Sequence, residues 1–82
     1  MASAHKCMIV RTADGVRRSV SIPPADVARF IATCYGSQHL FRRHLNAAAL
    51  ETVVRPGRSR SQLVRANLEQ RMIRIEQMRA AS

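Results

Sequence analysis

Two short segments of this chain, residues 17–23 and 57–65, are rich in arginine and serine side chains. The first segment is Arg-Arg-Ser-Val-Ser-Ile-Pro, and the second is Gly-Arg-Ser-Arg-Ser-Gln-Leu-Val-Arg. A guanidinium group forms two parallel hydrogen bonds with a phosphate or with the edge of a guanine, and a serine hydroxyl can donate to or accept from several base edges. These residue types therefore favour binding to a polyanion, and nucleic acid is the leading class.

The charge of the whole chain indicates the same kind of partner. Its 82 residues carry 14 basic and 5 acidic side chains, which gives a net charge of +9, and every basic residue except Lys6 is an arginine. A GC-rich genome would explain arginine in place of lysine, but it would not explain the excess of positive charge. A surface shaped only by solubility mixes both signs more evenly. We therefore expect a strongly acidic partner.

Metal binding and catalysis find little support in the sequence. Soft metal ligands are present at His5, Cys7, Cys34, His39 and His44. No two cysteines lie two to four residues apart, as they do in zinc fingers. The five carboxylates are scattered, and neither cysteine has the surroundings of an activated nucleophile. We expect no metal, no cofactor and no enzymatic activity.

Two cysteines do not make a disulfide framework, and the start of the chain lacks the pattern of a secretory signal. No stretch approaches the roughly 20 apolar residues that a membrane span needs. These features predict a cytoplasmic protein with reduced thiols and no membrane association.

The elements that must position the two segments fit into one small domain. We predict a flexible tail over residues 1–6, a single domain over 7–79 and a frayed end over 80–82. A chain of this length buries only about 60% of the surface that its unfolded form exposes, which favours a partner subunit. The core must be mostly aliphatic, because Phe30, Tyr35 and Phe41 are the only aromatic residues.

Two strands are predicted at the start of the domain. Residues 7–12 are rich in β-branched side chains, Asp14-Gly15 favours a tight turn, and residues 16–22 form the second strand. Alternation within that strand places Arg17, Ser19 and Ser21 on one face and Arg18, Val20 and Ile22 on the other. Pro23 and Pro24 then end the strand and begin a helix.

Three helices are predicted to follow, over residues 25–35, 37 to about 54, and about 60–78. Apolar residues recur in them at spacings of three and four. Gly36 ends the first helix, Ser37 caps the second, and Ser59 or Ser61 caps the third. The expected fold class is α+β, mostly α, with an N-terminal strand or hairpin followed by three helices.

Taken together, the two segments resemble the ribbon-helix-helix family of DNA-binding proteins, the Arc and MetJ type. In that family, strands from two subunits pair into a ribbon that enters the major groove. The resemblance implies a homodimer that binds double-stranded DNA, acting as a repressor or as an accessory factor on plasmid or mobile-element DNA. It implies base contacts from Arg17, Ser19 and Ser21. The implied phosphate contacts, at a glycine-led helix start, come from Arg58, Ser59, Arg60, Ser61 and Arg65.

The chain departs from the family pattern in having an additional strand, 7–12, and an additional helix, 37–54. The ribbon is therefore either intermolecular or an intramolecular hairpin. A helix-turn-helix over residues 28–45, with His39, Arg42 and Arg43 towards DNA, is one alternative. Another is a basic protein-interaction module, an inhibitor or assembly factor that docks on an acidic protein surface. RNA binding is less favoured, because few aromatic residues are available for base stacking.

Overall fold

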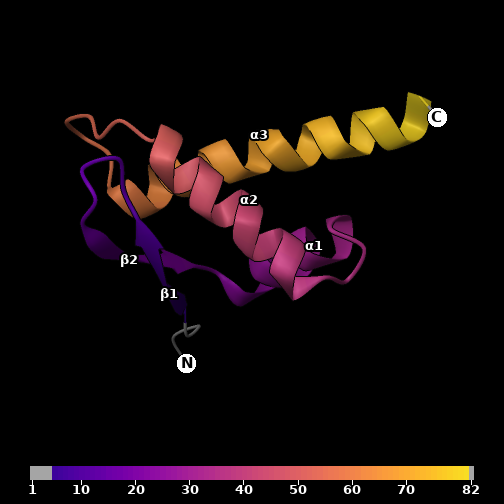
Figure 1. Cartoon of the computed structure of the whole chain (residues 1–82), viewed down its shortest axis with the longest axis horizontal. Coiled ribbons are helices and arrows are strands. Elements are labelled where there is room, and N and C mark those ends of the chain that lie inside the picture. Colours follow the sequence, from indigo (N-terminus) through magenta and orange to yellow (C-terminus); the bar gives the residue numbers. More distant parts are fainter. Residues whose placement is uncertain (1–4, 82) are drawn as a thin grey trace.

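A β-hairpin followed by three helices makes up the part of the chain that the structure describes, residues 5–81 of a computed structural model (Figure 1). The elements are β1 (Lys6–Arg11), β2 (Arg17–Ile22), α1 (Pro24–Thr33), α2 (Gln38–Glu51) and α3 (Arg60–Ala81). This arrangement confirms the α+β, mostly α class. The tail predicted over 1–6 falls largely outside the described residues, and Lys6 already belongs to β1; Ser82, in the predicted frayed end, also lies outside them.

The two strands pair with each other in antiparallel register, with Cys7 opposite Ser21 and Arg11 opposite Arg17. The ribbon in this chain is thus an intramolecular hairpin. At its turn Gly15 has φ +80°, the left-handed conformation that Asp-Gly was expected to supply. Asp14 accepts hydrogen bonds there from the Thr12 hydroxyl, from Arg18 and from a backbone N–H, and these bonds lower the pKa of its carboxyl.

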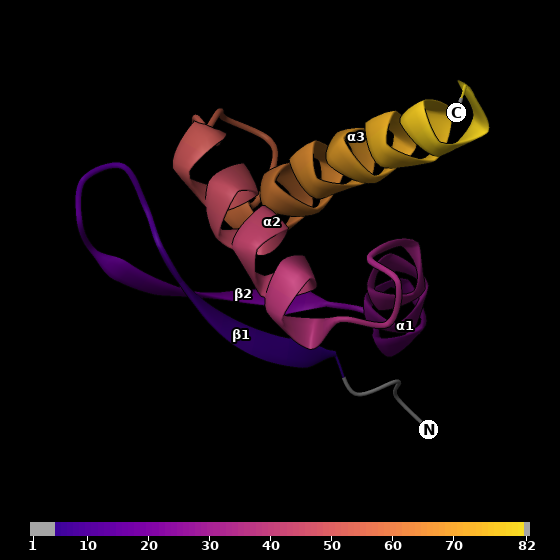
Figure 2. The same cartoon turned by 45° about the vertical axis from the view of Figure 1, so that its right-hand side comes forward.

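One face of the hairpin closes the core and the other is open. Val10, Val20 and Ile22 are buried on the inner face. The helices α2 and α3 lie over that side of the hairpin, and α1 continues from the end of β2 (Figure 2). Each helix adds an apolar stripe to the same core: Val27, Phe30 and Cys34 at α1; Phe41, Leu45, Ala48 and Ala49 on α2; Val64, Leu68 and Met72 on α3.

The helix ends follow from local hydrogen bonding. Ser37 caps α2 as predicted, because its Oγ accepts from the backbone N–H of Leu40 at 3.0 Å. The second helix ends at Glu51, not near residue 54: Thr52 has an extended backbone, and its hydroxyl donates to the Ala48 carbonyl at 2.7 Å. The first helix ends at Thr33, where Tyr35 and Gly36 both take positive φ.

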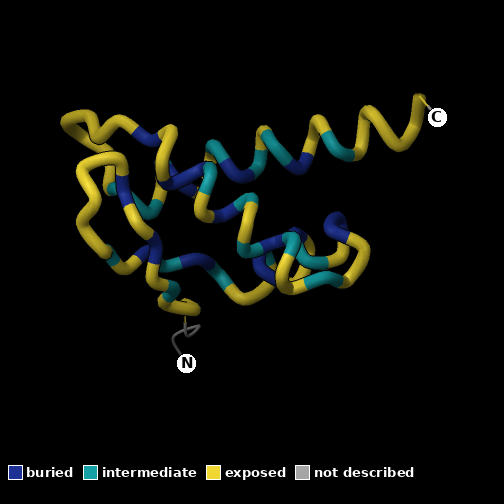
Figure 3. The backbone as a smooth tube through the Cα atoms, viewed as in Figure 1, coloured by how far each residue is buried: buried dark blue, intermediate teal, exposed yellow. Residues whose placement is uncertain are grey.

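The last turns of α3 extend beyond the core (Figures 1 and 3). Met72 is the last buried residue of this helix, which runs to Ala81 and so past the predicted end at residue 78. Arg79 ties this part to the end of α1, since it donates to the Thr33 carbonyl at 2.5 Å and lies over the Tyr35 ring. None of the helices within residues 5–81 is both long and apolar enough to cross a membrane.

Candidate nucleic-acid interface

The open face of the hairpin carries the three side chains that the sequence assigned to base contacts. Arg17 and Ser19 are exposed, and Ser21 is half-buried. Ser21 lies opposite Cys7, with their side-chain oxygen and sulfur 3.5 Å apart. Ile9, opposite Ser19, is also exposed. The face is therefore a two-stranded surface of small polar, apolar and arginine side chains.

A helix residue meets each edge of this hairpin. At the β2 edge, the backbone N–H of Ser21 donates to the Ser61 hydroxyl at 2.9 Å. At the β1 edge, the Arg42 guanidinium of α2 donates to the Ile9 carbonyl. The first contact brings the two arginine–serine segments, which are 40 positions apart in the chain, side by side.

The start of α3 is organised by a capping box. Ser59 Oγ accepts from the backbone N–H of Gln62 at 3.2 Å, and the Gln62 side-chain oxygen accepts from the N–H of Ser59 at 3.0 Å. Ser59 and Ser61 thus already accept one hydrogen bond each, while both hydroxyl hydrogens can still be donated. The first N–H groups of a helix also have no partner within it, which suits an anion.

The arginines that the sequence assigned to phosphate differ in their surroundings. Arg58 and Arg60 stand in the loop before α3 and in its first turn, beside the capping box, and neither has a carboxylate partner within residues 5–81. Arg65 is held by α1 instead, because its Nε donates to Asp26 at 2.7 Å. The structure therefore brings Ser61 against β2 and Arg60 beside the turn of the hairpin. Arg58 instead lines a groove with Arg65 and Glu69, and Asp26 neutralises Arg65.

A groove between β1 and α2 adds residues that the sequence did not assign to this surface. Arg11, Arg17, Arg42 and Asn46 line it together with Ile9, Val10 and Leu50, and none of these lining residues is acidic. We call it the arginine groove. Arg11 donates to the Gly15 carbonyl at 3.1 Å, so both Arg11 and Arg42 are held by backbone oxygens and keep further N–H groups to donate. The predicted turn at Asp14-Gly15 is the one sequence signal that could have placed Arg11 opposite Arg17.

Ion pairs between α1 and α3 neutralise Arg29 and Arg65. Arg29 bonds both Asp26 and Glu69, at 3.1 and 2.6 Å. Hydrogen bonding to Arg29 lowers the pKa of Glu69, and Glu69 and Asp26 in turn raise the pKa of Arg29. Burial opposes ionisation of Asp26, but the bonds from Arg29 and Arg65 outweigh it and lower its pKa.

The remaining arginines gather mostly around the hairpin and the loop between α2 and α3. Glu51 pairs with Arg71, and Asp14 pairs with Arg18. The turn of the hairpin and this loop lie at the same end of the molecule (Figure 1), where Asp14, Val54 and Arg60 line one shallow groove. The arginines without a carboxylate partner among the described residues are Arg11, Arg17, Arg42, Arg43, Arg55, Arg58, Arg60, Arg74 and Arg79.

Two of the groups considered for other chemistry, Cys34 and His44, are held in structural contacts. Burial raises the pKa of the Cys34 thiol, which lies 3.9 Å from the sulfur of Met72. His44 Nδ1 accepts from Arg71 at 3.1 Å, and burial, with Arg71 and Arg43 nearby, lowers its pKa. Between His5 and Ala81, no three His, Cys, Asp or Glu side chains gather closely enough to hold a metal ion.

The structure contains the short connection that the helix-turn-helix alternative requires, but Arg42, which that alternative turns towards DNA, makes a different contact. Residues 34–37 join α1 to α2, as such a motif requires. Arg42, however, is turned to the β1 edge, while His39 and Arg43 are exposed. Comparisons with models of protein families, with curated proteins and with solved structures give no match for this chain. The ribbon-helix-helix resemblance therefore stays a prediction, and the function must be argued from the surface itself.

Proposed function

We propose that this protein binds double-stranded DNA, with the open face of the hairpin in the major groove. One observation carries the proposal: arginines without carboxylate partners lie on and beside a two-stranded face that no helix within residues 5–81 covers. The major groove of B-DNA admits a two-stranded β-ribbon. Guanidinium groups beside such a ribbon can contact the phosphates that line the groove.

The contacts divide between bases and backbone. Arg17, Ser19 and Ser21 supply base contacts from β2, and Ile9 offers an apolar contact to a thymine methyl group. Arg58, Ser59, Arg60 and Ser61 contact phosphate on the β2 side. Arg11 and Arg42 do the same on the β1 side, through the arginine groove. Arg65 contributes little, because Asp26 already neutralises it.

The biological role that we propose is that of a cytoplasmic repressor, or of an accessory factor on plasmid or mobile-element DNA. One hairpin covers only a few base pairs, so we propose that a homodimer binds two half-sites about one helical turn apart. The dimer also supplies the partner surface that so short a chain favours.

A salt series with a mixed library of duplex DNA tests the proposal. If a dimer neutralises about six to ten phosphates, its affinity falls roughly 10³- to 10⁵-fold between about 50 and 200 mM salt. Fluorescence anisotropy of labelled duplexes measures this slope. Binding that stays flat over that range removes DNA as the partner.

Single substitutions separate base contacts from backbone contacts. Arg17→Ala should cost about 1–3 kcal/mol on the preferred sequence and relax the sequence preference, whereas Arg60→Ala should weaken all sequences alike and reduce the salt slope by about 1. Arg74→Ala is the matched control: it removes the same charge from an exposed site in the distant half of α3. If Arg74→Ala weakened binding as much as Arg17→Ala, the binding would depend on net charge alone and the assignment of base contacts would be wrong.

A second candidate function, docking on an acidic protein surface, is favoured by exposed apolar residues at the same end. Leu50 is 53% exposed and Val53 is 73% exposed, and Val53 shares a groove with Arg60. This function predicts a defined complex with an acidic protein and no preference among DNA sequences. The mass of the native species, with and without DNA, distinguishes the two candidates.

A further inference from the structure

A second hollow, which shares only Arg42 with the arginine groove, lies where β1, α1 and α2 meet. It measures about 510 Å³, within the range of small-molecule sites in proteins. Its apolar lining comes from all three elements: Met8 on β1, Val27 and Ile31 on α1, and Phe41 on α2. A hollow of this kind can take the apolar body of a small ligand.

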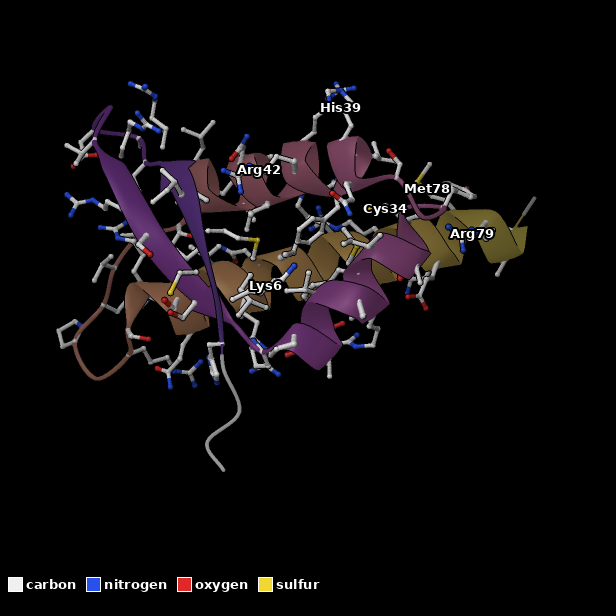
Figure 4. All side chains as sticks on the ribbon, turned by 90° about the horizontal axis from the view of Figure 1, so that it is seen from below. Lys6, Cys34, His39, Arg42, Met78 and Arg79 are labelled. Carbon is white, nitrogen blue, oxygen red and sulfur yellow. The ribbon has the colours of Figure 1, made fainter. Side chains whose placement is uncertain are left out.

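The rest of its lining is polar or basic. Lys6 on β1 and Arg42 on α2 stand at the hollow, and His39 lies farther out on α2 (Figure 4). Cys7 and Gln38 complete the lining, and no lining residue is acidic. Arg42 donates one N–H group to the Ile9 carbonyl, and its other N–H groups can bind a ligand. The hollow thus combines an apolar floor with two positive charges at its edge.

We propose that this hollow binds a small amphipathic carboxylate, with its apolar body against Met8, Ile31 and Phe41 and its head group between Lys6 and Arg42. Charge complementarity selects this class of ligand. A neutral apolar molecule would leave both cations without a counter-charge, and a cation would be repelled by them. A charged hydrogen bond in such a setting contributes more than a neutral one.

Arg42 connects this hollow to the arginine groove, because it lines both. A carboxylate that takes the free N–H groups of Arg42 withholds them from a DNA phosphate. The bound ligand therefore lowers the affinity for DNA, and DNA lowers the affinity for the ligand by the same factor. This consequence, unlike ligand binding itself, rests on the proposed DNA-binding function.

The first experiment uses decanoate and the full chain without DNA. Methyl NMR spectra are recorded during a titration that stays below the concentration at which decanoate forms micelles. We expect saturable shifts concentrated at Met8, Val27 and Ile31. Decanol, the uncharged isostere, should bind at least about tenfold more weakly. Shifts that do not saturate, that fall elsewhere, or that decanol reproduces with equal affinity overturn the proposal.

The matched variants are Lys6→Gln, which removes a charge at the hollow, and Arg74→Gln, which removes one far from it. Lys6→Gln should weaken decanoate binding about tenfold, and Arg74→Gln should leave it unchanged. Equal effects would overturn the assignment of the head group. Heteronuclear spectra of each variant without ligand show whether its fold is intact.

The second experiment repeats the DNA titration with saturating decanoate. We expect decanoate to lower the DNA affinity of the unaltered chain and to have a much smaller effect on Lys6→Gln, where each protein's own affinity without decanoate is the reference. Bound decanoate that leaves DNA affinity unaltered overturns the link through Arg42. If the protein binds DNA but not decanoate, the ligand site is overturned and the proposed function stands. If it binds decanoate but not DNA, the proposed function and the link through Arg42 are overturned, and the ligand site stands.

Discussion

Ser61 is the residue that joins the two arginine–serine segments. Its hydroxyl accepts the Ser21 N–H at 2.9 Å, so the first turn of α3 occupies part of the otherwise unpaired β2 edge. Arg42 occupies part of the β1 edge in a similar way. Each contact stiffens the hairpin from outside the strand ladder, which keeps its open face in one arrangement.

Ser61→Ala tests this contact. The change leaves the Ser21 N–H without its acceptor and should lower the free energy of unfolding by about 1 kcal/mol. It should also speed hydrogen exchange of the Ser21 amide in native-state NMR measurements. Ser21→Ala is the matched control, because it keeps the backbone N–H that makes the bond. Equal exchange of residue 21 in the Ser61→Ala variant and the unaltered chain would contradict this role.

At the scale of elements, charged side chains fasten α1 to α3. Asp26 accepts from Arg29 on its own helix and from Arg65 on α3, and Glu69 of α3 bonds Arg29 in return. The Asp26 side chain is only 15% exposed, so solvent screens its bonds less than it screens those of an ordinary surface pair. The network fixes α3 relative to α1. Because α1 follows the hairpin directly in the chain, the network also helps to hold α3 in place relative to the hairpin.

Asp26→Asn should therefore destabilise the fold by about 1–2 kcal/mol at pH 7. The pKa of this carboxyl is lower in the folded state than its unfolded value of about 3.9. Its contribution is thus fully present above that value and is lost as the pH falls through the folded pKa. Urea unfolding from pH 6 to pH 2 should show the unaltered chain losing more stability than the variant. Parallel curves would contradict the network's role.

Over the whole molecule, charge is distributed unevenly. The carboxylates of Asp26, Glu51 and Glu69 neutralise arginines on the helices. Most arginines without a carboxylate partner among residues 5–81 lie on the hairpin, in the loop between α2 and α3, or beside the hairpin, as Arg42 and Arg60 do. Folding brings these unpaired positive charges together, and their repulsion opposes the compact state. An anionic partner removes that cost when it binds.

We expect the free energy of unfolding to rise as sodium chloride increases from about 10 to 200 mM. Over that range the screening length shortens from about 30 Å to below 10 Å, which weakens repulsion between arginines on separate elements. The affinity for DNA should fall over the same range, so salt acts on folding and on binding in opposite directions. Chemical denaturation at several salt concentrations measures the first effect. Stability that falls with salt would show that the ion pairs, and not the repulsion, dominate.

Local patterns in the sequence determined the elements of this protein. Period-two alternation gave the two faces of β2, Asp14-Gly15 gave the turn, and apolar spacings of three and four gave the helices, because these features depend on bonds and periodicities within a few residues. One local feature was predicted wrongly: α2 ends at Glu51 and not near residue 54, because the Thr52 hydroxyl donates to the Ala48 carbonyl.

Only the tertiary structure decided which distant side chains meet. It placed Arg42 beside Arg11 and Arg17, bonded Ser61 to Ser21, and paired Arg65 with Asp26. These contacts depend on how α2 and α3 pack over the inner face of the hairpin, and that packing is governed by the fit of many buried side chains at once. The sequence therefore predicted a basic surface, and the packing determined which arginines form it.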